Sequence, residues 1–224
     1  MQLFPINLNI SGKAVVVVGG GAVACRKCRL LLDAGARVTV ISPRLEPALA
    51  DAAKEGKIAY LAREYREGDL AGAFLVFAAT DDASANSAVA REAEARGILA
   101  NVADDPQSGG FTLPSSLRRG DLIITVSTAG KSPALARAVR RQLEPQFGAE
   151  YLLTLDLLGK VREKLLTGGG DSAYNNKILN ELVAQDLPTL FRTHAFADID
   201  HHLLRLFGAG FSLADLGVRE RDPL

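Results

Sequence analysis

One stretch, residues 13–43, constrains the fold more than any other part of this 224-residue chain. A short apolar run rich in valine, Ala14–Val18, stops at three consecutive glycines, and a helical pattern of apolar residues follows until Gly35. A second β-rich run, 37–41, comes next. A buried strand, a glycine turn, a helix closed by a C′ glycine and another strand, all within about 30 residues, predict a βαβ unit.

The turn in this unit has the spacing Gly19-x-Gly21-x-x-Ala24. Gly19 permits the tight turn, Gly21 lets the backbone approach a pyrophosphate, and Ala24 keeps the helix close to the strand. The N-terminus of the helix adds free N–H groups and a partial positive charge. A glycine motif in this context predicts a dinucleotide-binding site rather than a merely structural turn.

The choice between NAD and NADP stays open on the residues alone. NAD-specific sites usually carry Asp or Glu at the end of the second strand, where the acid holds the ribose hydroxyls. Here that place holds Ser42, Pro43 and Arg44. Arg44 suits the 2′-phosphate of NADP, but it is equally compatible with a solvated loop charge.

The rest of the first half continues in βαβα order, with helices expected at 47–55 and 83–96 and strands at 58–61, 74–79 and 98–102. This order predicts a Rossmann-type doubly wound parallel sheet of the α/β class. Ligands bind such sheets beyond the carboxyl ends of the strands, so Thr80 and Asp81 are candidate cofactor neighbours. Capping of the next helix by Asp82 or Ser84 explains the same composition.

The pattern changes after residue 106. Two short runs, 111–113 and 122–126, are separated by Arg118-Arg119-Gly120-Asp121 and predict a hairpin. Ser132 and Pro133 then suit the N-cap and first position of a helix that runs to about residue 143. From Glu150 onward only helical segments are expected. We therefore predict a Rossmann domain at 1–112, a small α+β segment at 113–147 and a helical domain at 148–224.

The overall charge is balanced, so no global field favours nucleic acid or a membrane as partner. The first residues lack the basic region and apolar core of a signal peptide, and no apolar run approaches the ~20 residues of a membrane span. We expect a cytoplasmic protein.

One region nevertheless carries a local excess of five positive charges. Between residues 106 and 143 only Asp121 opposes the basic residues, which are Arg118, Arg119, Lys131, Arg137, Arg140 and Arg141. The last three share one face of the predicted helix. This patch suits a polyanionic small molecule better than nucleic acid, because no aromatic residues are interleaved for stacking. A solvated helix face is the alternative.

Other reactive side chains are few. Asp104 and Asp105 follow the fifth strand, where a carboxylate would accept a proton as a hydride leaves the substrate, although a turn is at least as good an explanation. Cys25 and Cys28 share a helix face and no second ligand pair accompanies them, so we favour buried thiols over a redox or metal site. The three histidines are all late in the chain, and we expect no resident metal.

Several stretches together resemble the precorrin-2 dehydrogenase/sirohydrochlorin ferrochelatase family, which forms the N-terminal module of siroheme synthases. They occur in family order over about residues 1–147, and the combination is far more specific than a Rossmann motif. The matching sequences are Phe4-Pro5, VVVGGGAVACRKCRLLLDAGARVTVISP, AATDD, NVADDP, FTLPS and ITVSTAGKSPALARAVRRQLE. The chain resembles the stand-alone form of this module.

This resemblance implies NAD as oxidant, a homodimer, and a tetrapyrrole substrate with acetate and propionate groups. Precorrin-2 would be oxidised to sirohydrochlorin, and in bifunctional members Fe2+ insertion follows to give siroheme. The family's catalytic aspartate falls on Asp104, and its cofactor contacts fall on Gly21, Ala22, Val23, Pro43 and Arg44. Thr128 occupies a serine position that some members phosphorylate. The chain also lacks a cysteine that many relatives carry shortly before Phe111.

Three other functions remain compatible with the residues. A different Rossmann oxidoreductase explains the cofactor site but not the basic patch. A non-catalytic NAD-sensing module would bind the nucleotide without turnover. A chelatase with a vestigial nucleotide site would insert metal without oxidation.

Overall fold

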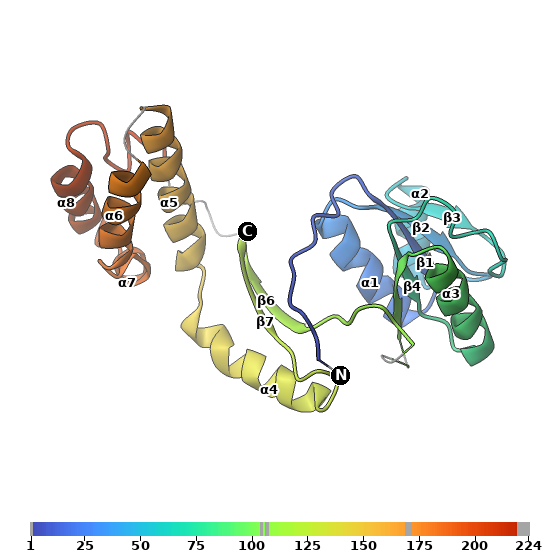
Figure 1. Cartoon of the computed structure of the whole chain (residues 1–224). Helices are drawn as coiled ribbons and strands as arrows, with labels where there is room; N and C mark the ends of the chain where they lie inside the picture. Colours follow the sequence, from blue (N-terminus) through green and yellow to red (C-terminus); the bar gives the residue numbers. More distant parts are fainter. Residues whose placement is uncertain (1, 104, 106–107, 169–171, 219–224) are drawn as a thin grey trace. The chain divides into compact units, whose positions relative to one another are not determined.

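The computed structural model describes residues 2–103, 105, 108–168 and 172–218. The chain forms two compact units, Met1–Leu113 and Pro114–Leu224 (Figure 1). The further division of the second unit at residue 147, which the sequence predicts, stays a prediction.

The first unit is built on five parallel strands, β1 (Ala14–Val18), β2 (Arg37–Ile41), β3 (Ala59–Leu61), β4 (Leu75–Ala78) and β5 (Leu99–Val102). Their order across the sheet is β3-β2-β1-β4-β5. The helices α1 (Ala22–Asp33), α2 (Pro47–Lys54) and α3 (Ala83–Ala95) connect them. This order confirms the doubly wound Rossmann sheet, whose strand order reverses between β1 and β4.

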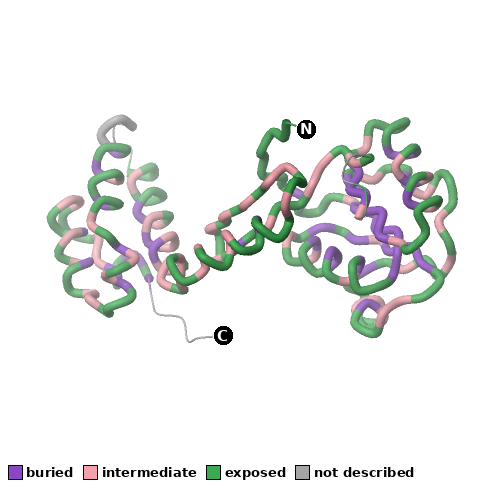
Figure 2. The backbone as a smooth tube through the Cα atoms, turned by 90° about the horizontal axis from the view of Figure 1, so that it is seen from below, coloured by how far each residue is buried: buried purple, intermediate pink, exposed green. Residues whose placement is uncertain are grey.

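Alternate residues of β1 enter two separate cores, because successive side chains of a strand point to opposite faces. Val15 and Val17 pack in the cluster that contains Ala24 of α1, whereas Val16 and Val18 pack in the cluster that contains Val89 of α3. Figure 2 shows this buried sheet in purple. Burial on both faces explains why the strand reads as an unbroken valine run.

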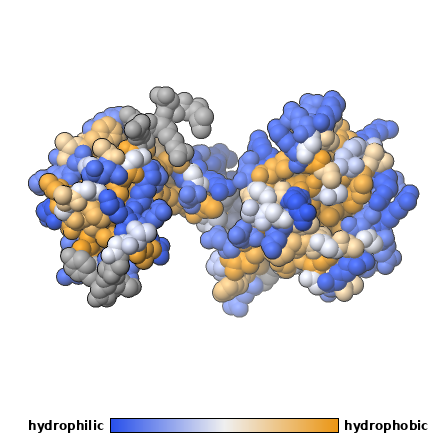
Figure 3. Space-filling view, turned by 90° about the horizontal axis from the view of Figure 1, so that it is seen from above, coloured by the Kyte–Doolittle hydropathy of each residue, from blue (hydrophilic) through white to orange (hydrophobic). Residues whose placement is uncertain are grey.

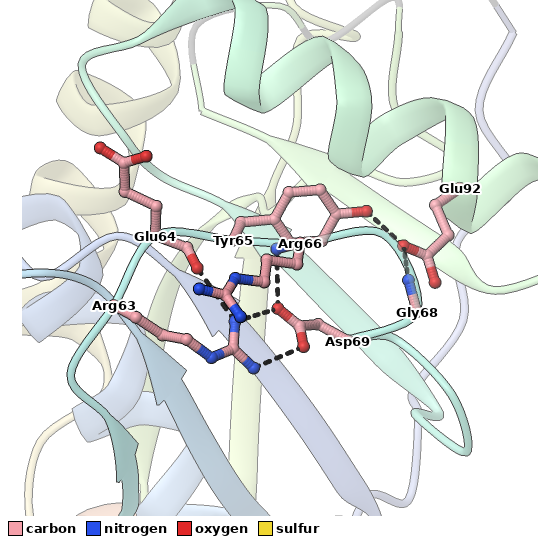
Figure 4. Close-up of polar contacts among 7 residues, drawn as sticks. All are labelled: Arg63, Glu64, Tyr65, Arg66, Gly68, Asp69 and Glu92. Atoms are coloured by element: carbon pink, nitrogen blue, oxygen red, sulfur yellow. Dashed lines mark hydrogen bonds and ion pairs between the residues drawn. The ribbon is translucent and has the colours of Figure 1, made fainter.

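The connection between β3 and β4, residues 62–74, contains no helix. A polar network holds this connection in place instead (Figure 4). The Arg63 guanidinium donates to both carboxylate oxygens of Asp69, each at 2.7 Å. The Tyr65 hydroxyl and the backbone N–H of Gly68 donate to Glu92 of α3. The loop is thereby tied to the helix that covers the same face of the sheet.

The second unit begins with an antiparallel hairpin, β6 (Ser115–Arg119) and β7 (Leu122–Val126). The sequence-based placement of its first strand at 111–113 is wrong. The Phe111 ring instead lies edge-on against Phe77 of the first unit, with ring centroids 5.5 Å apart. The polar segment that was expected to be the turn supplies the end of the strand, and only Gly120 and Asp121 connect β6 to β7.

Helix α4 (Pro133–Leu143) follows, and the Ser132 hydroxyl caps it by accepting from the Leu135 N–H, as predicted. A short 3-10 turn, η1 (Glu144–Gln146), leads to the helices α5 (Glu150–Thr167), α6 (Ser172–Val183), α7 (Leu187–Arg192) and α8 (Phe196–Phe207). Leu157, Leu182 and Leu203 are fully buried in their common core. No helix in the described part of the chain is long and apolar enough to cross a membrane.

Candidate nucleotide-binding site

Gly19 lies where the ends of three strands meet. Its N–H donates to the carbonyl of Ile41 at the end of β2, over 2.9 Å. A Cβ atom at Gly19 would lie 2.2 Å from the carbonyl oxygen of Ala79, just after β4, and its φ of +122° disfavours any other residue. Glycine is therefore required here by the fold itself, at the point where the strand order reverses.

Gly21 is the N-cap of α1 and has an ordinary φ of −87°. A Cβ atom there would have nothing within 4 Å. No side chain caps this helix, and its first turn carries no acidic residue. The exposed Ala22 and Val23 begin the helix, whereas Ala24 is fully buried against the sheet. Open space beside an uncapped helix N-terminus fits a pyrophosphate.

The loop after β2 folds back onto this turn. The N–H of Glu46 donates to the carbonyl of Gly20 over 2.8 Å. A Cβ atom at Gly20 would lie 2.0 Å from the carbonyl oxygen of Arg44, and that oxygen accepts from the Ser42 hydroxyl at 2.7 Å. Pro43 and Arg44 are exposed beside the glycine turn. The structure thus brings these two predicted cofactor residues next to Gly19 and Gly21.

Thr80 and Asp81 follow β4 at the same edge of the sheet. The Thr80 hydroxyl donates to Asn86 over 2.8 Å, and Asp81 is exposed. Asp82, rather than Ser84, caps α3 by accepting from the N–H groups of Ser84 and Ala85. The hydrogen bonds from Ser84 hold the pKa of Asp82 below its usual value. Contact of Thr80 and Asp81 with a cofactor stays a prediction.

Asp104, the predicted catalytic base, lies outside the described residues. Asp105 is exposed and accepts from the backbone N–H of Ser108 over 3.3 Å, which is the geometry of a turn.

Sequence reasoning missed a buried lysine on α1. Lys27 is only 8% exposed, and its ammonium group donates to the side-chain oxygen of Asn101, near the end of β5, over 2.6 Å. The same group lies 5.0 Å from the centre of the Phe77 ring. The Asn101 amide in turn donates to the carbonyl of Phe111 over 3.0 Å. The available signal was position: Lys27 shares the apolar helix face of Ala24 and Leu31, where a lysine is unusual.

The two cysteines are free thiols. Cys28 is buried, as expected, and burial together with the neighbouring Cys25 raises its pKa to about 12, so it is not a nucleophile at neutral pH. Cys25 is half-buried. Among the described residues, no three His, Cys, Asp or Glu side chains come together as a metal site. His194 and His201 are exposed and His202 is half-buried.

The predicted substrate-binding residues belong to the second unit and are not equivalent. Arg119 donates to the carbonyl of Phe147 over 2.9 Å, and Arg118 donates to that of Gly120 at the same distance. Arg140 forms an ion pair with Glu144 at 3.0 Å. Lys131, Arg137 and Arg141 are exposed. Within the described ranges these three have no ion-pair partner, so they are the cations most available to a ligand.

Two family models match consecutive parts of the chain. Residues 6–115 match the model described as "Putative NAD(P)-binding", and residues 119–146 match "Sirohaem biosynthesis protein central". Siroheme synthase 1 of Aeromonas salmonicida is 42% identical over 184 residues, which cover 80% of this chain and 39% of that protein. The siroheme synthase of Nitrosococcus oceani is 48% identical over 151 residues, which cover 67% and 32%.

The chain thus spans less than two fifths of the length of these relatives. Among solved structures, SirC, a precorrin-2 dehydrogenase, superposes with a TM-score of 0.73 at 23% identity, over 89% of this chain and 100% of that one. That likeness establishes the shared fold. The two matched domains, their order and the identity to siroheme synthases together place the chain in the precorrin-2 dehydrogenase/sirohydrochlorin ferrochelatase family.

Proposed function

We propose that this protein oxidises precorrin-2 to sirohydrochlorin with NAD+ as the electron acceptor, in the biosynthesis of siroheme. The observation that carries the proposal is the match of residues 6–146 to two consecutive domains, one for NAD(P) binding and one from sirohaem biosynthesis proteins. The open glycine turn supports it, because the space beside Gly21 and the uncapped end of α1 fit a pyrophosphate.

The reaction removes one hydride and one proton from precorrin-2. NAD+, when bound, accepts the hydride and its two electrons and becomes NADH. The protein must hold the pyrophosphate, orient the substrate and supply an acceptor for the proton. We assign the first task to Gly21, Ala22 and Val23, with Pro43 and Arg44 beside them, and the last to Asp104.

Substrate recognition requires cations, because precorrin-2 carries several acetate and propionate groups. We assign this role chiefly to Lys131, Arg137 and Arg141, whose side chains are exposed and not engaged by other described side chains. The internal bonds of Arg118, Arg119 and Arg140 leave them less free, so we expect smaller contributions from these three.

We further propose that the enzyme is cytoplasmic and that it forms a homodimer. In residues 114–147 only Leu117 and Ala136 are buried, so the hairpin and α4 lack a core of their own (Figure 2). Ile123, Leu135 and Leu152 are large apolar residues that remain about half exposed in the second unit. Figure 3 shows the apolar residues on one face of the molecule in orange. A partner subunit that covers these three residues would remove their apolar surface from water.

Absorption spectroscopy of precorrin-2 under anaerobic conditions tests the proposed function. Sirohydrochlorin should form with NAD+ and not without it. A sensing module would bind NAD+ and leave the spectrum unchanged, and a chelatase alone would respond to Fe2+ without NAD+. An unrelated Rossmann oxidoreductase would leave precorrin-2 untouched.

Separate replacement of two neighbouring aspartates by alanine tests the assignment of Asp104 as the catalytic base. A positioned base contributes roughly 10²–10⁴-fold in rate, so Asp104→Ala should lower kcat by about that factor and keep NAD+ affinity. Asp105→Ala is the matched control and should cost much less, because Asp105 is an exposed turn residue. Equal effects of the two changes would make Asp104 a turn residue as well. Fe2+ insertion by Asp104→Ala shows whether chelation needs the same side chain.

A further inference from the structure

Glu46 presents an unpartnered carboxylate beside the glycine turn. It is the N-cap of α2, but its side chain makes no capping bond. Its Oε2 atom is enclosed and accepts no hydrogen bond, although the residue as a whole is only half-buried. An enclosed carboxylate oxygen without a donor is unfavourable. The residue as a whole is half-buried rather than buried, so part of its side chain remains within reach of a ligand that brings hydroxyl donors.

The backbone links this carboxylate to the candidate cofactor site. The N–H of Glu46 donates to the Gly20 carbonyl over 2.8 Å, so residue 46 is held against the middle glycine of the turn. Glu46 comes five residues after the end of β2. The bond to Gly20 nevertheless holds its backbone against the glycine turn.

The Ser42 hydroxyl and the other described carboxylates of this region already have partners. The Ser42 hydroxyl, at the usual position of the acid, donates to the carbonyl of Arg44. Asp51 forms an ion pair with Lys54 at 3.0 Å, and Glu55 forms one with Lys57 at 2.6 Å. Of the carboxylates described between residues 42 and 57, Glu46 is the one next to the turn without such a partner.

We propose that Glu46 accepts hydrogen bonds from the ribose hydroxyls of the adenosine half of NAD+, and so selects NAD+ over NADP+. This inference rests on the proposed nucleotide site. Rossmann domains specific for NAD use an acid at the end of β2 for this purpose, and its place here holds Ser42. A 2′-phosphate would meet the Glu46 carboxylate with like charge, which opposes any attraction by Arg44.

The test is calorimetric titration of the intact chain with NAD+, with NADP+, and with NAD+ that lacks the 2′-hydroxyl of its adenosine ribose. Glu46→Ala should weaken NAD+ binding by about 10–100-fold, the range for a hydrogen bond to a charged group. The same change should leave NADP+ affinity equal or raised. Asp51→Ala, on the same helix, is the matched control and should change none of the three affinities.

The NAD+ analogue without the 2′-hydroxyl measures the interaction free energy between that hydroxyl and the Glu46 side chain. The wild-type protein should bind it more weakly than NAD+, and Glu46→Ala should bind both equally. Equal binding of NAD+ and the analogue by the wild-type protein would overturn the proposal without any variant. The proposal would also be overturned if Glu46→Ala lost the same factor of affinity for NAD+ and for the analogue while circular dichroism showed a folded protein. Failure of the wild-type protein to bind NAD+ at all would instead overturn the proposed function.

Discussion

The three glycines of the turn have two different roles, one in packing and one in leaving space for a ligand. A side chain at Gly19 would strike the Ala79 carbonyl, and one at Gly20 would strike the Arg44 carbonyl, so both are required by packing. Gly21 meets nothing and has an ordinary backbone conformation. Its lack of a side chain therefore has no explanation within the described chain, and a ligand that approaches the backbone closely supplies one.

Substitution separates these roles. Gly21→Asp should abolish NAD+ binding, because the new carboxylate places bulk and negative charge where phosphate is expected, and it should keep the fold. Gly19→Ala should lower the free energy of unfolding by more than about 2 kcal/mol, because it combines a clash with a disfavoured φ. Calorimetric titration and thermal unfolding measure the two effects. Unchanged NAD+ affinity of Gly21→Asp would move the nucleotide elsewhere.

The residues of the turn were predictable because their spacing alone carries the signal. Lys27 left a weaker signal, its position on the apolar helix face of Ala24 and Leu31, and only the structure shows that this face is buried. Glu46 left no signal in the sequence. Glu46 lies in a loop whose path back to Gly20 depends on one backbone hydrogen bond that no periodicity records.

At the scale of elements, α4 presents arginines of two kinds. Arg137 and Arg141 are exposed and free of ion pairs with other described residues, whereas Arg140 is paired with Glu144. Arg137→Ala combined with Arg141→Ala should raise KM for precorrin-2 and weaken its dependence on ionic strength, because exposed charges are screened by salt. Steady-state kinetics over a salt series measure both, with Arg140→Ala as the control of smaller effect. A change in oligomeric mass with an unaltered KM would assign these arginines to a subunit interface instead.

The network between the β3–β4 loop and α3 predicts an acid-dependent stability (Figure 4). Burial opposes ionisation of Glu92, but hydrogen bonds from Tyr65, Gly68 and Arg96 outweigh it and hold the pKa of Glu92 below its usual value. The folded-state pKa is therefore lower than the unfolded one. Its contribution to stability is present above the unfolded value of about 4.3 and is lost as the pH falls through the folded pKa. The pKa of Asp69, lowered by Arg63, acts in the same direction.

Glu92→Gln should therefore lower the free energy of unfolding at neutral pH by roughly 1–3 kcal/mol and flatten its decline toward acid. Urea denaturation at a series of pH values measures both quantities. Glu94→Gln, an exposed position on the same helix, should do neither. Parallel curves of unfolding free energy against pH for the wild-type protein and Glu92→Gln would show that Glu92 does not cause the acid-dependent loss of stability.

The strands show which elements the pattern of apolar residues predicts and which it does not. The central strands β1 and β4 were predicted closely, because burial on both faces of the sheet requires a continuous apolar run such as Leu75–Ala78. Strand β6 was missed, because it is Ser-Ser-Leu-Arg-Arg with only Leu117 buried. The apolar Phe111 nearby belongs to a different core, and only tertiary structure separates the two.

At the scale of the whole molecule, the chain joins a Rossmann unit to a second unit whose hairpin and first helix have almost no core of their own. The first unit carries the candidate nucleotide site, and the second carries the exposed cations expected to meet a polyanionic substrate. The chain matches siroheme synthases over less than two fifths of their length. We therefore expect these 224 residues to perform the oxidation by themselves.

A single-turnover reaction tests this expectation. The enzyme, in excess over precorrin-2, is mixed anaerobically with NAD+, and NADH fluorescence and sirohydrochlorin absorbance are recorded together. One NADH should form for each sirohydrochlorin, at the same rate, and neither product should form with Gly21→Asp. Formation of sirohydrochlorin without NADH, or an equal rate with Gly21→Asp, would contradict this expectation.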